Sequence, residues 1–342
     1  MLCALSSCIK PFDIDVDEGA KILVVNGLIT NEPGPYTVKL NKTTSYGGHF
    51  TDVHKDVLGA AVTITDDLGI TETLAEVREG EFQTKVNGIQ GRIGGAYTLR
   101  IRLKNGEEYV SETEKLQPVP PIDRLYFVFR ETTTVDADGN EADAPLFEIR
   151  IDAKDPANEK NFYRWVSIGT YEVETQPENF KIIDRRGNQI AAPKECCWQC
   201  WITKAGYTAA VISDRQFNGK SLIGQPVSTI PITPQYLGIK YHVRLKQYSL
   251  SERGFTFWQM LGTQSSGTGS VQDPAPANLH GNITNAHNAD EQVLGYFGAS
   301  AVETKSMYIK RSDVPISLSR FEFPDDCRVI SGATTTKPSF WE

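Results

Sequence analysis

The residues of this chain whose type and spacing most clearly predict chemistry are its six cysteines. Cys8 directly follows Leu5, Ser6 and Ser7. Small residues just before a cysteine are typical of a bacterial lipobox, where signal peptidase cuts and the freed cysteine receives acyl chains. Each acyl chain contributes about 0.8 kcal/mol per buried CH₂, and two or more chains hold a protein stably on a membrane. We therefore predict that Cys8 is the lipid attachment site.

The flanking segments fit a tethered protein. Residues 1–8 are interpreted as the remainder of a signal peptide with its lipobox, although they are shorter than the usual 15 to 30 residues and carry no Lys or Arg before Cys8. Residues 9–20 are predicted to form an extended acidic tether, because they have little to bury. In some Gram-negative bacteria an acidic stretch soon after the lipidated cysteine directs a lipoprotein to the cell surface, and residues 9–20 resemble it. A merely solvated spacer is the alternative.

If Cys3 is removed with the signal segment and Cys8 carries the lipid, four of the six cysteines remain: Cys196, Cys197, Cys200 and Cys327. Four cysteines permit three pairings. A bond between the adjacent Cys196 and Cys197 is expected to be strained, so we predict that one member of the cluster pairs with Cys327. Closing that long loop would stabilise the fold by about 4 to 5 kcal/mol in the chain-entropy model. A Cys-x-x-Cys spacing also occurs in redox and zinc sites, but an exported, strand-rich chain favours structural disulfides.

Two further groups of polar residues have spacings that suggest a metal. His49, Asp52, His54 and Asp56 lie in one predicted loop, but no third fixed ligand accompanies the histidines. Residues 136–143 have the acidic spacing of a calcium loop without its bidentate glutamate, so a hairpin tip is the preferred interpretation. We predict no metal and no cofactor.

Known catalytic signatures are missing from the sequence. It contains no His-Glu-x-x-His, no Gly-x-Ser-x-Gly, no phosphate loop and no dinucleotide fingerprint. We therefore predict no enzyme. A glycosidase pair of carboxylates leaves no sequence signature, so an extracellular hydrolase acting on glycan or peptide remains an alternative. The net charge of -8 argues against a nucleic-acid partner, since such proteins need basic surfaces.

The segments that must position these residues are mostly strands. At 342 residues, two domains are expected. Between 21 and 116, short alternating runs such as 97–103, which stops at the hairpin cue 104–106, predict an immunoglobulin-like β-sandwich. Prolines within 117–121 mark a boundary. Residues 122–342 are predicted to form a second β-rich domain, so that the whole chain is mainly β.

One convincing helix is predicted near 250–263. The sequence Ser249-Leu250-Ser251-Glu252 matches a capping box. Large apolar side chains then follow at spacings of three and four, and the residues are Phe255, Phe257, Trp258 and Leu261. We expect these aromatic side chains to pack on a sheet as core residues.

Several ordered stretches together resemble domain-of-unknown-function family 4249. The stretches are 26–35, 214–220, 249–251, 257–258, 273–277, 281–283, 293–300 and 326–328. The resemblance implies an outer-membrane lipoprotein of Bacteroidota, encoded beside TonB-dependent transporters. This family has no established catalytic residues, so only Cys8, as the lipid site, carries over.

The resulting functional hypothesis is a lipid-anchored outer-membrane protein, exposed at the cell surface. It would act as a non-catalytic accessory or binding subunit of a TonB-dependent transporter barrel and help capture a small-molecule or oligomeric nutrient. The alternatives are the extracellular hydrolase and a structural component of an outer-membrane assembly. The sequence names no ligand-binding residue.

Overall fold

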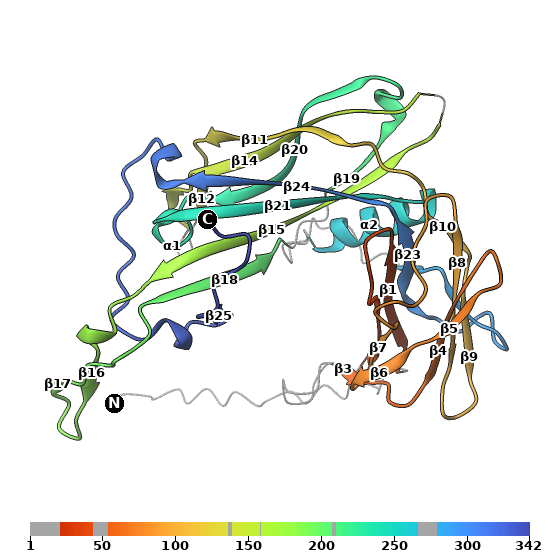
Figure 1. Ribbon diagram of the computed structural model, residues 1–342, viewed down its shortest axis with the longest axis horizontal. Helices are drawn as coiled ribbons and strands as arrows, with labels where there is room; N and C mark the ends of the chain where they lie inside the picture. Colours follow the sequence, from red (N-terminus) through yellow and green to blue (C-terminus); the bar gives the residue numbers. More distant parts are fainter. Residues whose placement is uncertain (1–20, 44–53, 136–138, 158, 207–209, 266–278) are drawn as a thin grey trace, which may run out of the picture.

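The computed structural model describes residues 21–43, 54–135, 139–157, 159–206, 210–265 and 279–342. Strands dominate it, as Figure 1 shows, and the predicted mainly β fold is confirmed. Upright strands form a sandwich at one end of the view, and longer strands run across the rest of the molecule. Cys8 and the tether 9–20 lie outside the described residues.

The sandwich consists of two sheets. The first has the order β23 (Leu294–Ser300), β1 (Leu23–Thr30), β2 (Thr37–Thr43), β7 (Glu81–Gln83), β6 (Ala75–Arg78), with β3 (His54–Asp56) also paired to β2. The second has the order β22 (Ile283–Asn285), β9 (Glu108–Ser111), β8 (Ala96–Arg102), β4 (Ala61–Asp66), β5 (Thr71–Thr73), with β10 (Glu114–Lys115) also paired to β8.

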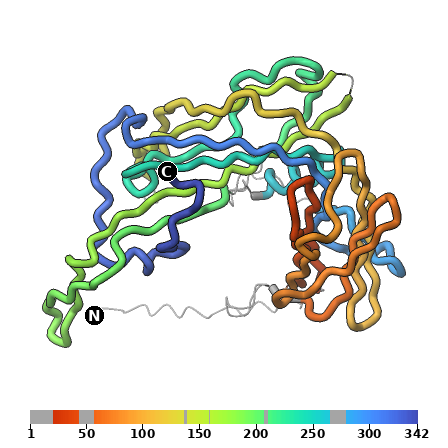
Figure 2. Tube along the Cα trace, viewed as in Figure 1, coloured from red at the N-terminus to blue at the C-terminus, as the bar shows by residue number. Residues whose placement is uncertain are grey.

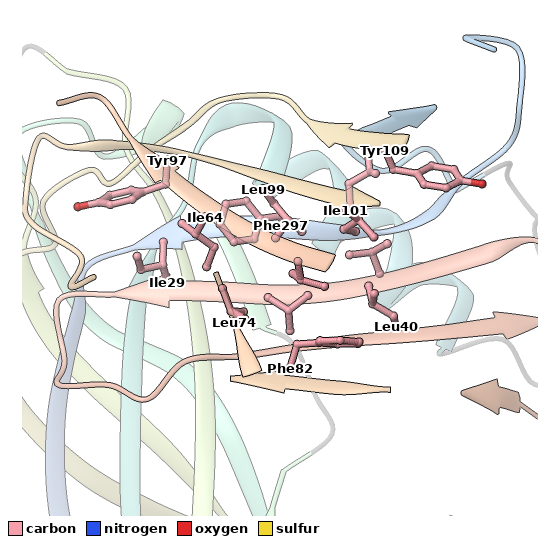
Figure 3. Packing of buried hydrophobic residues seen from close by; sticks show 14 of the residues in the cluster. Ile29, Leu40, Ile64, Leu74, Phe82, Tyr97, Leu99, Ile101, Tyr109 and Phe297 are labelled. Atoms are coloured by element: carbon pink, nitrogen blue, oxygen red, sulfur yellow. The ribbon is translucent and has the colours of Figure 1, made fainter. Parts of the chain in front are cut away.

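Alternating residues of both sheets fill the sandwich core. Figure 3 shows Ile64 and Leu99 of the second sheet beside Ile29 and Leu40 of the first. All four side chains are at most 1% exposed. The predicted hairpin is present as well, because β8 and β9 pair across a turn in which Gly106 has a φ of 92°. The alternation in the sequence therefore identified this core correctly.

Two strands of the sandwich come from the far end of the chain. β23 pairs in parallel with β1, and β22 pairs antiparallel with β9. Gly295 permits the close approach of β23, because it has a φ of 93° and an added Cβ would lie 1.8 Å from the Val25 carbonyl oxygen. The predicted division into two domains at 116–122 therefore does not hold for residues 283–300, because they belong to the sandwich although they follow that boundary in the sequence. Such long-range pairing has no local sequence signal.

The second unit packs a three-stranded sheet on a larger one. The smaller sheet has the order β11 (Ile122–Arg130), β14 (Leu146–Lys154), β20 (Ser221–Pro231). The larger has the order β24 (Val302–Lys310), β21 (Lys240–Ser249), β15 (Phe162–Glu174), β18 (Gln199–Ala205), β25 (Ala333–Thr334), with β19 (Ala210–Ser213) also on β15. Phe147, Trp165 and Leu245 lie in the core between them, each at most 1% exposed.

Short elements complete the second unit. The two hairpins are β12 (Thr133–Val135) with β13 (Glu141–Asp143), and β16 (Lys181–Ile183) with β17 (Gln189–Ala191). The short helices are α1 (Pro234–Leu237), η1 (Pro177–Asn179), η2 (Asp214–Gln216), η3 (Arg311–Asp313) and η4 (Cys327–Val329). The pairing of β12 with β13 agrees with a hairpin at the acidic segment, of which residues 136–138 lie outside the described part of the chain.

Helix α2 (Glu252–Ser265) confirms the predicted helix. Its cap differs from the prediction, because Ser251 rather than Ser249 accepts a hydrogen bond from the Gly254 N–H at 3.0 Å. Ser249 ends β21, where its hydroxyl accepts from the Ala301 N–H at 2.9 Å and donates to the Gln117 carbonyl at 2.6 Å. Ser249, two residues before Ser251, therefore connects β21 to neighbouring segments instead of capping the helix.

Several polar contacts hold the two units together. Lys246 forms an ion pair with Glu32 at 2.7 Å, and Gln247 donates to the Pro120 carbonyl at 2.8 Å. The Val302 N–H also donates to the Asn31 side chain at 2.7 Å. The tube in Figure 2 shows the blue C-terminal part of the chain entering the red and orange sandwich. The proline-rich connection is thus held on β21 of the larger sheet.

Candidate ligand-binding site

A cavity of about 430 Å³ lies between the outer face of the first sandwich sheet and α2. Strands β1 and β23 form one wall, and α2 forms the facing wall together with residues of β15 and β21. Cavities of roughly 300 to 1,000 Å³ are the usual size for small-molecule sites. The cavity lies where sandwich, helix and larger sheet meet, so no single local stretch of sequence forms it.

Strand β1 has apolar side chains on both of its faces, one in the sandwich core and one in the cavity wall. Val25 and Ile29 are fully buried in the sandwich core. Val24 and Leu28, on the opposite side of the strand, line the cavity. On the neighbouring β23, Gly298 leaves room beside Leu28, since an added Cβ would lie 3.3 Å from the Leu28 Cδ1 atom. An apolar run on both faces explains why residues 23–30 show little polar alternation.

A row of aromatic rings extends across the cavity. Tyr296 of β23 stacks on Phe257 of α2 with ring centroids 5.0 Å apart. Phe257 in turn lies edge to face with Trp258 at 5.4 Å. The expectation that the helix packs its aromatics on a sheet is confirmed, and Phe255 also contacts Phe162 of β15 at 5.1 Å. Phe257 and Trp258 also line the cavity with apolar surface.

Glu114 lies at the Tyr296 end of this row and is 3% exposed. Its Oε1 atom accepts a hydrogen bond from the Tyr296 hydroxyl at 2.5 Å and one from Asn282 Nδ2 at 3.4 Å. Burial raises the pKa of Glu114 above its ordinary value of 4.5, while hydrogen bonds from Tyr296, Ser251 and Asn282 oppose that rise. The result is a carboxyl group that holds its proton to higher pH than a solvated glutamate.

The raised pKa of Glu114 has a consequence for stability. Well below pH 4.5 the side chain is protonated in both the folded and the unfolded state. As the pH rises, the unfolded state ionises first and the free energy of unfolding falls. Glu114→Gln cannot ionise and still offers an oxygen to Tyr296. Urea unfolding should therefore show that its stability relative to wild type increases as the pH rises above about 4.5. Glu79→Gln, at an exposed position, is the matched control. A pH-independent difference would contradict a raised pKa for Glu114.

Arg164 lies at the Trp258 end of the row. Its guanidinium carbon is 3.4 Å from the Trp258 ring centroid and 5.8 Å from that of Tyr248. Burial lowers the pKa of Arg164 to about 10, so the group remains positively charged at neutral pH. Within the described part of the chain Arg164 takes part in no ion pair, and its Nε atom has no hydrogen-bond partner.

The predicted disulfide residues lie elsewhere, at the far end of the larger sheet. Cys200 of β18 is bonded to Cys327, with an S–S distance of 2.00 Å and a sequence separation of 127. The adjacent Cys196 and Cys197 are also bonded to each other. This second bond corrects the expectation that neighbouring cysteines would not pair. Cys197 and Cys200, the two cysteines of the Cys-x-x-Cys spacing, are therefore not bonded to each other.

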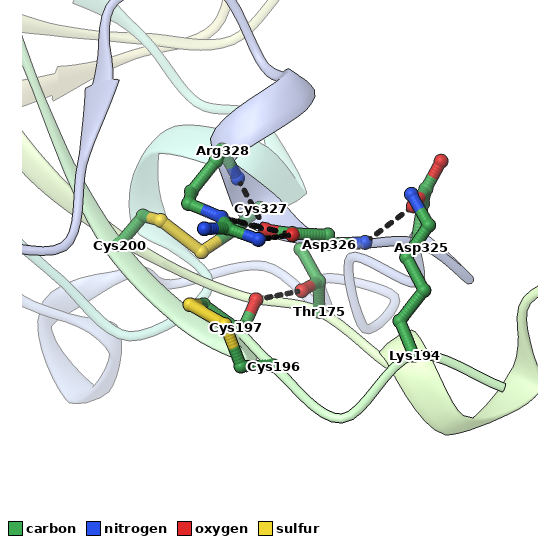
Figure 4. Close-up of polar contacts among 9 residues, drawn as sticks. All are labelled: Thr175, Lys194, Cys196, Cys197, Cys200, Asp325, Asp326, Cys327 and Arg328. Atoms are coloured by element: carbon green, nitrogen blue, oxygen red, sulfur yellow. Dashed lines mark hydrogen bonds and ion pairs between the residues drawn. A yellow bond between two sulfur atoms is a disulfide. The ribbon is translucent and has the colours of Figure 1, made fainter.

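Figure 4 shows the polar contacts around the two disulfides. The Cys197 carbonyl accepts from the Cys327 N–H at 2.9 Å and from the Thr175 hydroxyl at 3.3 Å. Asp326 forms an ion pair with Arg328 at 2.5 Å. Hydrogen bonds from Arg328 hold the pKa of Asp326 well below its usual range. This cluster fixes the C-terminal segment on β18, and none of its residues lines the cavity.

The structure describes two of the four residues suggested as metal ligands. His54 and Asp56 lie on β3, whereas His49 and Asp52 fall outside the described residues. Among the residues that the structure describes, no group of three or more His, Cys, Asp or Glu side chains is placed to hold a metal.

Sequence reasoning missed the polar residues of the cavity. Arg164 occurs inside a run that alternates as a strand, where a charged residue normally faces solvent, and Glu114 precedes the proline-rich boundary. Their positions depend on how three distant segments pack. Of the cavity wall, only the apolar residues on the outer face of 23–30 could be noticed in the sequence. A strand at a sandwich surface is otherwise expected to alternate apolar and polar residues.

In the described residues no helix is long and apolar enough to cross a bilayer. No curated protein matches the chain. A family model described as "Domain of unknown function (DUF4249)" matches residues 9–306, which is most of the chain and includes both walls of the cavity. The protein therefore belongs to the DUF4249 family, as its ordered motifs predicted.

Proposed function

We propose that this protein is a lipid-anchored outer-membrane lipoprotein, held at the cell surface by acyl chains on Cys8. In this proposal it is a non-catalytic accessory subunit of a TonB-dependent transporter and captures a small ligand for uptake. In this proposal the acidic segment 9–20 connects the lipid on Cys8 to the folded part of the chain. The family membership and the lipobox pattern support this location.

The cavity between β1, β23 and α2 is the observation that carries the binding role. It combines an apolar wall with a few converging polar groups, which is the composition typical of small-molecule sites. Its walls come from both units, and the contacts of Lys246 and Gln247 hold those units in place. A site with fixed walls binds without first having to order them.

Binding is favoured over hydrolysis by the chemistry of the wall. Glu114 is the one carboxyl side chain among the described residues that line the cavity. Glycoside hydrolysis uses two carboxyl groups on opposite sides of the scissile bond. Glu114 is also engaged by Tyr296 and Asn282, which suits a positioning role.

The proposal is tested by purifying the tagged native protein from detergent-solubilised outer membranes. Mass spectrometry should identify a diacylated or triacylated Cys8 peptide and a co-purifying TonB-dependent transporter. Cys8→Ser is the control, because it removes the lipid and should release the protein from the membrane fraction. An unmodified Cys8 thiol, or recovery of the protein without any transporter, would contradict the proposal.

A further inference from the structure

We infer that the cavity accepts an organic acid with an apolar body, whose carboxylate pairs with Arg164. This inference deepens the proposed binding role and rests on it. Three features support this ligand class: the unpartnered Nε atom of Arg164, the aromatic surface beside it and the distribution of charge in the cavity.

Arg164 has hydrogen-bonding capacity that the chain does not use. A guanidinium carries five N–H donors in a planar fork that matches a carboxylate. Across the described residues the Arg164 side chain donates no hydrogen bond that satisfies its buried Nε atom, and no carboxylate pairs with it. Buried polar groups are normally satisfied, so an unpartnered Nε atom in a cavity wall favours a ligand with an anionic acceptor group.

The surroundings of Arg164 fix the direction of its free donors. Trp258 covers one face of the guanidinium at 3.4 Å, and Tyr248 lies at 5.8 Å. Stacking occupies the face of the planar group and leaves its N–H edge for in-plane partners. The backbone of Arg164 is held on both sides, by pairing with Val211 of β19 and with Tyr248 of β21. The donors are therefore positioned before any ligand arrives.

The remaining wall suits an apolar body. From Arg164 the ring of Trp258 leads to Phe257 and Tyr296, and Leu28 contributes aliphatic surface from the opposite side. At the Tyr296 end, the buried Glu114 carboxyl is occupied by hydrogen bonds from the protein. Arg164 is the one cationic side chain among the described lining residues. A ligand's acid group is thus directed to Arg164 and its apolar part to the aromatic row.

The test uses calorimetry on the full chain carrying Cys8→Ser, which needs no detergent. The titrants are octanoate, 1-octanol and octyltrimethylammonium, which share one alkyl chain and differ in charge. Octanoate should bind more tightly than 1-octanol, and the cation should bind most weakly. Equal affinity for octanoate and 1-octanol would overturn the choice of an acid while leaving a binding cavity in place. Absence of heat with every titrant at two well-separated temperatures would overturn the cavity as a site for such amphiphiles altogether, because burial of an alkyl chain changes the heat capacity.

Variants then assign the effect to one side chain. Arg164→Gln should weaken octanoate binding by about ten- to a hundredfold, the range for losing a hydrogen bond to a charged group, and should leave 1-octanol binding unchanged. Arg164→Lys should restore part of the loss, because the charge remains. Arg244→Gln is the matched control, since Arg244 lies on the adjacent strand β21 and does not line the cavity. Unchanged octanoate affinity in a folded Arg164→Gln protein would contradict the inference.

Discussion

The double variant Cys200→Ser with Cys327→Ser is expected to lose about 4 to 5 kcal/mol of unfolding free energy. The bond closes a loop with a sequence separation of 127 residues, and it holds η4 on β18. In the chain-entropy model, a closed loop of about 100 residues contributes roughly 4.7 kcal/mol. Urea unfolding of wild type and variant, followed by tryptophan fluorescence, measures the difference.

The second disulfide provides the control for this experiment. Cys196 and Cys197 are neighbours, so their bond closes almost no loop in the unfolded chain. Cys196→Ser with Cys197→Ser should therefore lower stability much less than removal of the long-range bond. Equal losses in the two double variants would show that loop closure is not the main contribution of the Cys200 to Cys327 bond.

Phe297→Ala is expected to lower the free energy of unfolding by about 3 to 5 kcal/mol, the range for truncating a buried phenylalanine. Phe297 is 0% exposed and lies between the two sandwich sheets, although it belongs to β23 near the end of the chain (Figure 3). Its backbone is also fixed, because its N–H donates to Asn282 Oδ1 at 3.0 Å and its carbonyl accepts from Asn282 Nδ2 at 2.8 Å.

Chemical denaturation also measures this effect, with Ile223→Ala as the control. Ile223 is 76% exposed, so its truncation should change stability by less than about 0.5 kcal/mol. The Phe297 variant should unfold in one transition in which the sandwich is lost. A small loss for Phe297→Ala, similar to that of the control, would contradict the conclusion that β23 completes the sandwich.

Local patterns predicted the elements of this fold better than their assembly. Residues 97–103 alternate cleanly, and all but the last lie in β8; the spacing of Phe255, Trp258 and Leu261 identified α2. These signals depend on each element's own exposed and buried faces. The pairing of β23 with β1 depends on residues more than two hundred positions apart, and nothing in either strand specifies the partner.

The candidate site was less predictable for the same reason. Its polar groups, Glu114 and Arg164, line the cavity only because α2 and β23 pack beside them. The spacing of residues in the sequence does not predict this packing. The cysteines were identifiable by type, and their chemistry as disulfides followed from an exported, strand-rich chain. The bond between Cys196 and Cys197 was not expected, because general disulfide geometry disfavours neighbouring residues.

The central claim is that the cavity between the sandwich and α2 holds a ligand. Native mass spectrometry of the protein purified from its own membrane, compared with Leu28→Trp, tests this claim most directly. Leu28 is partly exposed and lines the cavity, so the larger indole should fill the space without disturbing the sandwich core. We predict that wild type carries the added mass of a small molecule and that folded Leu28→Trp does not. The same added mass on both proteins, or none on wild type, would contradict the claim.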